Sequence, residues 1–136
     1  MNIKYKSILL IDDDEINNTI NKIIIKGSDF AEETVAITNP LEALQYVKQN
    51  CIEMKECPQV VFLDINMPIM NGFEFLEELN KIYRHFLEKV PVIMLSSSKN
   101  EQDLQMANSF NIAGFVHKPL TPEKLDELAA NLPKKL

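Results

Sequence analysis

The sequence predicts an α/β fold, a doubly wound sheet of five parallel strands that alternate with helices, (βα)5. Two observations lead to this prediction. Five short apolar segments alternate with segments whose apolar residues repeat at helical spacing. The apolar segments are continuous, which indicates strands buried on both faces of a sheet, and parallel strands need helices as crossovers. The expected strand order is 2-1-3-4-5, and we expect residues 1–136 to form a single domain.

The first two strand–helix units lie before residue 50. Residues 8–11 form the first strand, and the helix after them ends near Gly27. Its expected inward face has the spacing i, i+4, i+7, i+8 and consists of Ile16, Ile20, Ile23 and Ile24. Residues 34–37 form the second strand. Asn39 and Pro40 supply the N-cap and first-turn proline of the next helix, whose apolar face holds Leu41, Leu44 and Val47.

The remaining three units follow the same pattern. Strands are expected at residues 60–63, 91–95 and 114–116. The helix after Gly72 carries an apolar face of Phe73, Leu76, Leu79, Tyr83 and Phe86, with His85 in solvent. Residues 98–101 have capping-box spacing and open a short helix with few apolar residues, Leu104, Ala107 and Phe110. Thr121 caps the last helix, whose apolar face is Leu125, Leu128, Ala129 and Leu132.

Composition narrows the function classes. The formal net charge is −6 and Arg84 is the one arginine, so we expect no binding to nucleic acid. No apolar stretch approaches the roughly 20 residues that span a bilayer, and the run at residues 8–11 is too short for a signal peptide. We therefore expect a cytoplasmic protein without membrane contact. Cys51 and Cys57 are expected to be free thiols, because the cytosol disfavours disulfides. The connection at residues 50–59 has no evident function.

Polar side chains follow four of the five strands. Asp12, Asp13 and Asp14 follow the first strand. Asp64 ends the third, Ser96 follows the fourth and Lys118 follows the fifth. In such sheets, ligands bind beyond the carboxyl ends of the strands, at the point between strands one and three where the connections diverge. Each residue alone is a weak signal, because an Asp run after a strand is more often a cap and a solvated turn. Their joint position at one edge is specific.

The chemistry of this group points to a metal and a phosphoryl group. Neighbouring carboxylates cannot all stay ionised unless a positive charge joins them. Mg²⁺ binds a few carboxylate oxygens and keeps several waters, which leaves positions for a phosphoryl oxygen. The metal and a fixed ammonium would then neutralise the charge of a phosphoryl group in transfer to a carboxylate.

The sequence resembles the receiver domains of bacterial response regulators, which have a flavodoxin-like fold. Four segments carry the resemblance: residues 9–14 (LLIDDD), 61–72 (VFLDINMPIMNG), 91–97 (PVIMLSS) and 115–119 (FVHKP). The resemblance covers nearly the whole chain and leaves no residues for an output domain, which is typical of the stand-alone subclass. It implies a signalling switch of a two-component system, phosphorylated by a sensor histidine kinase or a histidine phosphotransfer protein and read by a downstream protein that the sequence does not name.

The resemblance also implies a role for each matching residue. Asp64 accepts the phosphoryl group. Mg²⁺ is bound directly by Asp13, Asp64 and the main-chain carbonyl of Asn66, and through water by Asp12. Ser96 and Lys118 bind phosphoryl oxygens, and Ser96 and Phe115 form the switch. The peptide bond before Pro119 is cis, and Asp14 caps the first helix. Ser96 stands where threonine is frequent and Phe115 where tyrosine is common, which could alter how the switch is read.

Two other functions stay open at this point. A Mg²⁺-dependent phosphohydrolase of the haloacid-dehalogenase type would use an aspartyl intermediate, but it has an Asp at the position that Asn66 occupies, and this chain is short for a substrate cap. A scaffold that works without phosphorylation would more often have lost the acidic pair or the lysine. We therefore expect a protein that is not a turnover enzyme and catalyses only its own phosphorylation and dephosphorylation.

Overall fold

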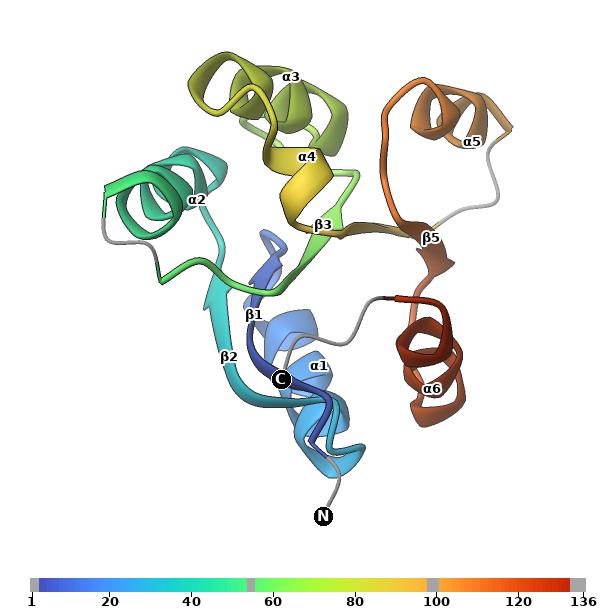
Figure 1. Cartoon of the computed structure of the whole chain (residues 1–136). Helices are drawn as coiled ribbons and strands as arrows, with labels where there is room; N and C mark the ends of the chain where they lie inside the picture. Colours follow the sequence, from blue (N-terminus) through green and yellow to red (C-terminus); the bar gives the residue numbers. More distant parts are fainter. Residues whose placement is uncertain (1–2, 54–55, 98–100, 133–136) are drawn as a thin grey trace.

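The computed structural model describes residues 3–53, 56–97 and 101–132 and contains the predicted sheet. Five parallel strands lie in the order β2-β1-β3-β4-β5 (Figure 1). The strands are β1 (Tyr5–Ile11), β2 (Ala31–Ile37), β3 (Val60–Asp64), β4 (Val92–Ser96) and β5 (Gly114–His117). The helices are α1 (Glu15–Gly27), α2 (Pro40–Val47), α3 (Gly72–Ile82), α4 (Phe86–Lys89), α5 (Glu101–Asn108) and α6 (Pro122–Asn131). A π-helical segment, Lys48–Glu53, extends α2.

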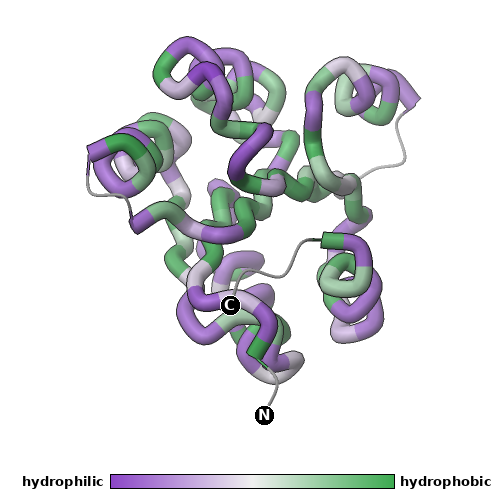
Figure 2. The backbone as a smooth tube through the Cα atoms, viewed as in Figure 1, coloured by the Kyte–Doolittle hydropathy of each residue, from purple (hydrophilic) through white to green (hydrophobic). Residues whose placement is uncertain are grey.

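Helices cover both faces of the sheet (Figure 1). Alternate residues of β1, β3 and β4 point to opposite faces and build two apolar layers. One layer packs against α2, α3 and α5, and the other against α1 and α6. The central strands consist mostly of hydrophobic residues, as Figure 2 shows, and β3 and β4 are buried along their whole length. The sequence signal of continuous apolar runs is therefore explained by this double burial.

The predicted inward face of α1 is wrong for three of its four residues. Ile16, Ile20 and Ile23 are 70%, 46% and 67% exposed. The buried residues of this helix are Asn18, Asn21 and Ile25, and Ile24 packs at the edge of the same layer. The helix carries isoleucine on several sides, so helical periodicity alone could not select the face that meets the sheet. The three exposed isoleucines form an apolar stripe on the solvent side of α1.

Two other helix predictions need correction. Leu41 is 53% exposed, whereas Leu44 and Val47 are buried as predicted, together with Pro40 and Ala43. The helix that begins at Gly72 ends at Ile82, because the backbone turns at Tyr83. Phe86 opens the separate helix α4 and is fully buried in the core, and His85 precedes α4 with its exposed side chain 3.0 Å from Glu88.

The expectation that Cys51 and Cys57 are free thiols is also wrong in this structure, where they form a disulfide with a Cα–Cα distance of 4.3 Å. The bond joins the π-helical segment after α2 to the segment that leads into β3. Both cysteines are half-buried against the core layer that α2 and α3 cover. The disulfide therefore crosslinks the described parts of this connection, residues 50–53 and 56–59, just before β3 begins.

The expected helix caps are confirmed where the structure describes them. Asp14, Asn39 and Thr121 each accept backbone N–H groups from the first turn of α1, α2 and α6. The helix α1 ends at Gly27 as predicted, although the positive φ of 54° that follows belongs to Asp29. The predicted capping box at residues 98–101 lies mostly outside the described residues.

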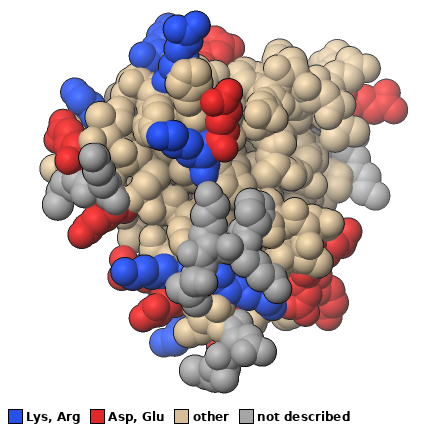
Figure 3. Space-filling model, viewed as in Figure 1, with Lys and Arg blue, Asp and Glu red and all other residues tan. Residues whose placement is uncertain are grey.

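The surface carries charges of both signs. On the face seen in Figure 3, Lys and Arg side chains are interspersed with Asp and Glu side chains. Among the described helices, none is both long enough and apolar enough to cross a bilayer.

Candidate phosphoryl and metal site

The carboxyl-terminal edge of the sheet brings together the residues that the sequence places after its strands. Asp64 and Ser96 are the last residues of β3 and β4, and Asp12 and Lys118 directly follow β1 and β5. Asp12 and Ser96 are fully buried, and Asp64 is 2% exposed. Buried ionisable groups of this kind are costly unless they are paired, so their presence at a strand edge is typical of a functional site.

Lys118 joins two of the carboxylates. Its ammonium nitrogen lies 2.9 Å from Oδ2 of Asp12 and 3.0 Å from Oδ1 of Asp64. The backbone N–H of Lys118 also donates to the carbonyl of Ser96 over 2.8 Å, which ties the end of β5 to the end of β4. The Lys118–Pro119 peptide bond is cis, as the sequence resemblance implied. The lysine is thus fixed with its charge between the two buried acids.

Asp13 completes an acidic cluster with these residues. Asp12, Asp13 and Asp64 each offer a carboxylate oxygen, and the three oxygens lie within 4.8 Å of one another. Asp12 and Asp64 are buried, while Asp13 is exposed. Hard oxygen donors at this spacing, with one side open to solvent, fit a divalent cation that keeps part of its water shell.

The surroundings of Asp64 raise the pKa of its carboxyl. Burial, followed by the neighbouring charge of Asp12, raises the pKa of Asp64 to about 6, although hydrogen bonding to Lys118 acts in the opposite direction. Burial lowers the pKa of Lys118, but its hydrogen bonds to Asp12 and Asp64 and their charges outweigh this, and the net pKa is raised. The single ammonium of Lys118 therefore does not neutralise the negative charge of the carboxylates around it.

The chain after β3 is shaped by close packing around Asp64. A Cβ atom on Gly72 would lie 2.8 Å from the carbonyl oxygen of Asp64 and 2.8 Å from Cε of Met94, so this position needs glycine. The N–H of Gly72 donates to the carbonyl of Ile65 over 2.8 Å. Asn71 and Glu74 form a capping box at the start of α3. Asn66, the expected carbonyl ligand, is exposed beside the cluster, and its N–H lies 3.4 Å from Oδ1 of Asp64.

The first loop is held by contacts that sequence reasoning found only in part. Asp14 accepts N–H groups from Ile16 and Asn17 and caps α1, as predicted. The N–H of Asp14 donates to Oδ1 of Asp12. The side chain of Asn18, which the sequence reading did not single out, donates from Nδ2 to the backbone carbonyl of Asp12 over 2.9 Å. The available signal was a pair of asparagines, Asn18 and Asn21, inside an isoleucine-rich helix.

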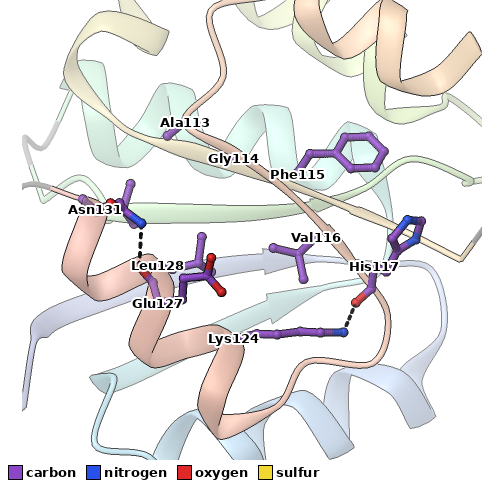
Figure 4. Close-up of a pocket in the computed structure, with 10 residues that line it drawn as sticks. Ala113, Gly114, Phe115, Val116, His117, Lys124, Glu127, Leu128 and Asn131 are labelled. Carbon is purple, nitrogen blue, oxygen red and sulfur yellow. Dashed lines mark hydrogen bonds between the residues drawn. The ribbon is translucent and has the colours of Figure 1, made fainter. Parts of the chain in front are cut away.

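Phe115, the expected switch residue, is half-buried on the side of the sheet that faces α5. Its ring packs against the core layer of α3 and α5 and lies 6.1 Å from the ring of His117. Figure 4 shows Val116 on the opposite side, at a groove of about 370 Å³ between β5 and α6, where Lys124 donates to the carbonyl of His117. Asp12, Asp13 and Asp64 do not line this groove.

The helix α5, which lies beside Phe115, is weakly anchored. Of its described residues, only Ala107 is buried, and Leu104 and Met106 are about half exposed. Just beyond the helix, Phe110 stacks on Phe73 of α3 with ring centres 5.9 Å apart. This confirms the predicted sparse apolar face.

Comparison with known proteins identifies the family. Residues 8–130 match the response regulator receiver domain. The chain is similar to a two-component response regulator from Cytophaga hutchinsonii, with 32% identity, a TM-score of 0.86, and coverage of 93% of this chain and 96% of that structure. It is 26% identical over 114 residues to response regulator Rcp1 of Synechocystis sp., covering 83% of this chain and 76% of Rcp1. It is 30% identical over 130 residues to the probable transcriptional regulator ycf29 of Porphyra purpurea, covering 96% of this chain but only 57% of that protein.

The chain belongs to the response regulator receiver domain family. It is therefore a receiver domain of two-component signalling, in which phosphorylation activates the signal, kinases supply the phosphoryl group and downstream proteins read it. The acidic cluster of Asp12, Asp13 and Asp64 fits the divalent-metal pocket of this family.

Proposed function

We propose that Asp64 accepts a phosphoryl group from a phosphohistidine of a sensor histidine kinase or a histidine phosphotransfer protein, and that Mg²⁺ is the metal at the site. The observation that carries this proposal is the position of Asp64, a buried carboxylate at the end of β3 that lies 3.0 Å from the Lys118 ammonium and beside Asp12 and Asp13. A carboxylate, a cation and a metal-binding acidic pair are the groups that transfer to an aspartate requires.

The transfer itself forms one bond and breaks another. A carboxylate oxygen of Asp64 attacks phosphorus, the bond between phosphorus and the histidine nitrogen breaks, and the electron pair stays on the imidazole, which takes up a proton. Lys118, whose ammonium lies 3.0 Å from Oδ1 of Asp64, would pair with a phosphoryl oxygen, and the Ser96 hydroxyl at the end of β4 would donate to another. Asp13, Asp64 and the carbonyl of Asn66 would hold Mg²⁺ directly and Asp12 through water, and bound Mg²⁺ would neutralise charge on the phosphoryl oxygens.

The surface beside the site supports a protein as phosphoryl donor. Ile16, Ile20 and Ile23 form an exposed apolar stripe along α1, which starts next to the acidic cluster. Apolar surface of this kind is typical of a docking site for another protein. A helical donor seated on this stripe would have its histidine within reach of the carboxyl edge of the sheet. The downstream partner is a second, separate protein, and residues 1–136 act as one domain in both contacts.

The test is labelling with a small phosphoryl donor. Acetyl phosphate with Mg²⁺ should add one phosphoryl group, detected by intact-protein mass spectrometry, and Asp64→Asn should remove it. Asp14→Asn is the matched control, because Asp14 lies in the same loop but caps α1. Labelling that persists in Asp64→Asn, or that proceeds in EDTA, would refute the assigned site. Steady turnover of a phosphomonoester panel would instead indicate a phosphohydrolase.

A further inference from the structure

Asn18 has a buried side-chain amide, and within the described part of the chain only one of its two polar atoms has a hydrogen-bond partner. The residue lies on the inner face of α1 and is 5% exposed. Its Nδ2 donates to the carbonyl of Asp12, but its buried Oδ1 has no hydrogen-bond partner among the described residues. A buried acceptor without a partner lowers the stability of the fold, so an apolar side chain would suit the fold better at this position.

The contact that Asn18 does make bears on the acidic cluster. The carbonyl of Asp12 belongs to the peptide group that joins Asp12 to Asp13. On the other side of Asp13, the N–H of Asp14 donates to Oδ1 of Asp12. The two peptide groups that flank Asp13 are therefore each fixed by one hydrogen bond, and Asn18 supplies one of the two.

Asp13 depends on these bonds more than its neighbours do. Asp12 and Asp64 are buried and paired with Lys118. Asp13 is exposed, and within the described part of the chain its carboxylate accepts no hydrogen bond that would hold it near the other two acids. Its direction is set by the backbone that carries it.

We infer that Asn18 is a positioning residue for the metal site: it fixes the Asp12–Asp13 peptide group and so directs the Asp13 carboxylate toward Asp12 and Asp64. This inference rests on the proposed metal site. Residues that orient ligands in this way commonly change metal affinity by about tenfold or more when they are replaced. The cost of the unpaired Oδ1 is then explained by a function that a leucine could not perform.

The test compares two asparagines of the same helix. Asn18→Leu removes both the donor and the unpaired oxygen at nearly constant volume. Asn21→Leu is the matched control, because Asn21 is also 5% exposed but lies three residues further from the acidic loop. Asn18→Ala serves as a second variant if the leucine side chain does not fit. Mn²⁺ and Mg²⁺ dissociation constants are measured at a temperature where circular dichroism shows every variant to be folded.

We expect Asn18→Leu to weaken metal binding roughly tenfold without loss of stability, and Asn21→Leu to change it less than about twofold. If the wild type binds metal and Asn18→Leu binds equally tightly, the positioning role is refuted while the metal site stands. Equal weakening in both variants refutes the role as well, because it would reflect the helix as a whole. A wild type that binds no metal overturns the proposed site and this inference with it.

Discussion

The raised pKa of Asp64 makes the stability of the metal-free protein depend on pH in a predictable direction. An isolated Asp has a pKa of 3.8, and in the fold burial and the charge of Asp12 raise this value to about 6. Well below pH 3.8 the carboxyl is protonated in both the folded and the unfolded chain. As pH rises from 4 to 6, the unfolded chain ionises first, so the free energy of unfolding falls. Above pH 6 the folded chain carries the full free-energy cost of the buried, ionised Asp64 carboxylate.

The size of this penalty follows from the shift. About two pKa units at about 1.4 kcal/mol each correspond to about 3 kcal/mol at neutral pH. Asp64→Asn removes the titration but keeps the size of the side chain, and Lys118 keeps its contact with Asp12. We therefore expect Asp64→Asn to match the wild type near pH 4 and to be more stable by up to about 3 kcal/mol at pH 7.5. For a chain of 136 residues this is about 10 °C in Tm.

The assay is urea unfolding in EDTA between pH 4 and pH 7.5. The chain has no tryptophan, so circular dichroism is the suitable signal. The difference between wild type and variant cancels the titration of groups that do not interact with Asp64. Saturating Mg²⁺ should stabilise the wild type at neutral pH and reduce this difference, because the cation binds the ionised carboxylate. Parallel curves for the two proteins across the whole pH range would show that Asp64 is not destabilised by its surroundings.

Three further predictions follow from other parts of the structure. Asp13→Asn should weaken Mg²⁺ binding more than Asp14→Asn in a calorimetric titration, and equal losses would mean that the roles in the first loop are misassigned. Reduction of the Cys51–Cys57 disulfide, which closes a short loop, should lower the free energy of unfolding by about 2 kcal/mol and Tm by about 7 °C. The double serine variant should not respond to reductant, and an unchanged Tm in the wild type would contradict the prediction. Beryllofluoride with Mg²⁺ should shift amide NMR signals across residues 96–115, because α5 is weakly anchored beside Phe115; shifts confined to the loops around the acidic cluster would exclude this route of transmission.

The grouping of the site residues at one edge of the sheet was predictable because the sequence signals are local and the parallel topology brings the strand ends together. Asp64 and Ser96 each end a continuous apolar run, and Lys118 directly follows the short strand β5. Once the strands are parallel, their carboxyl ends must share one edge of the sheet. Residues that are far apart in the sequence are therefore expected to meet there, although the sequence gives no distances between them. What the sequence could not supply was the pairing geometry, in which one ammonium contacts two buried acids.

The errors arose where several local patterns were equally compatible with the sequence. In α1, isoleucine occupies both the buried side, at Ile25, and the exposed side, at Ile16 and Ile23, so periodicity could not identify the face that packs. At Tyr83 no glycine or proline marks the end of α3, and the helix ends there so that Phe86 can enter the core from a separate turn. Both outcomes depend on tertiary packing, which a single-sequence pattern does not contain.

The charge balance of the site explains why the metal and the phosphoryl group belong together. Within the described residues, three clustered carboxylates face the single ammonium of Lys118. Burial, together with the neighbouring charge of Asp12, raises the pKa of Asp64 despite this ammonium. Phosphorylation would replace the charge of one carboxylate by about −1.5 to −2 at the same place. The phosphorylated site would thus need a divalent cation more than the free site does. On the proposed assignment, Mg²⁺ binding would be a condition of accepting phosphate, and proton binding at Asp64 would compete with both.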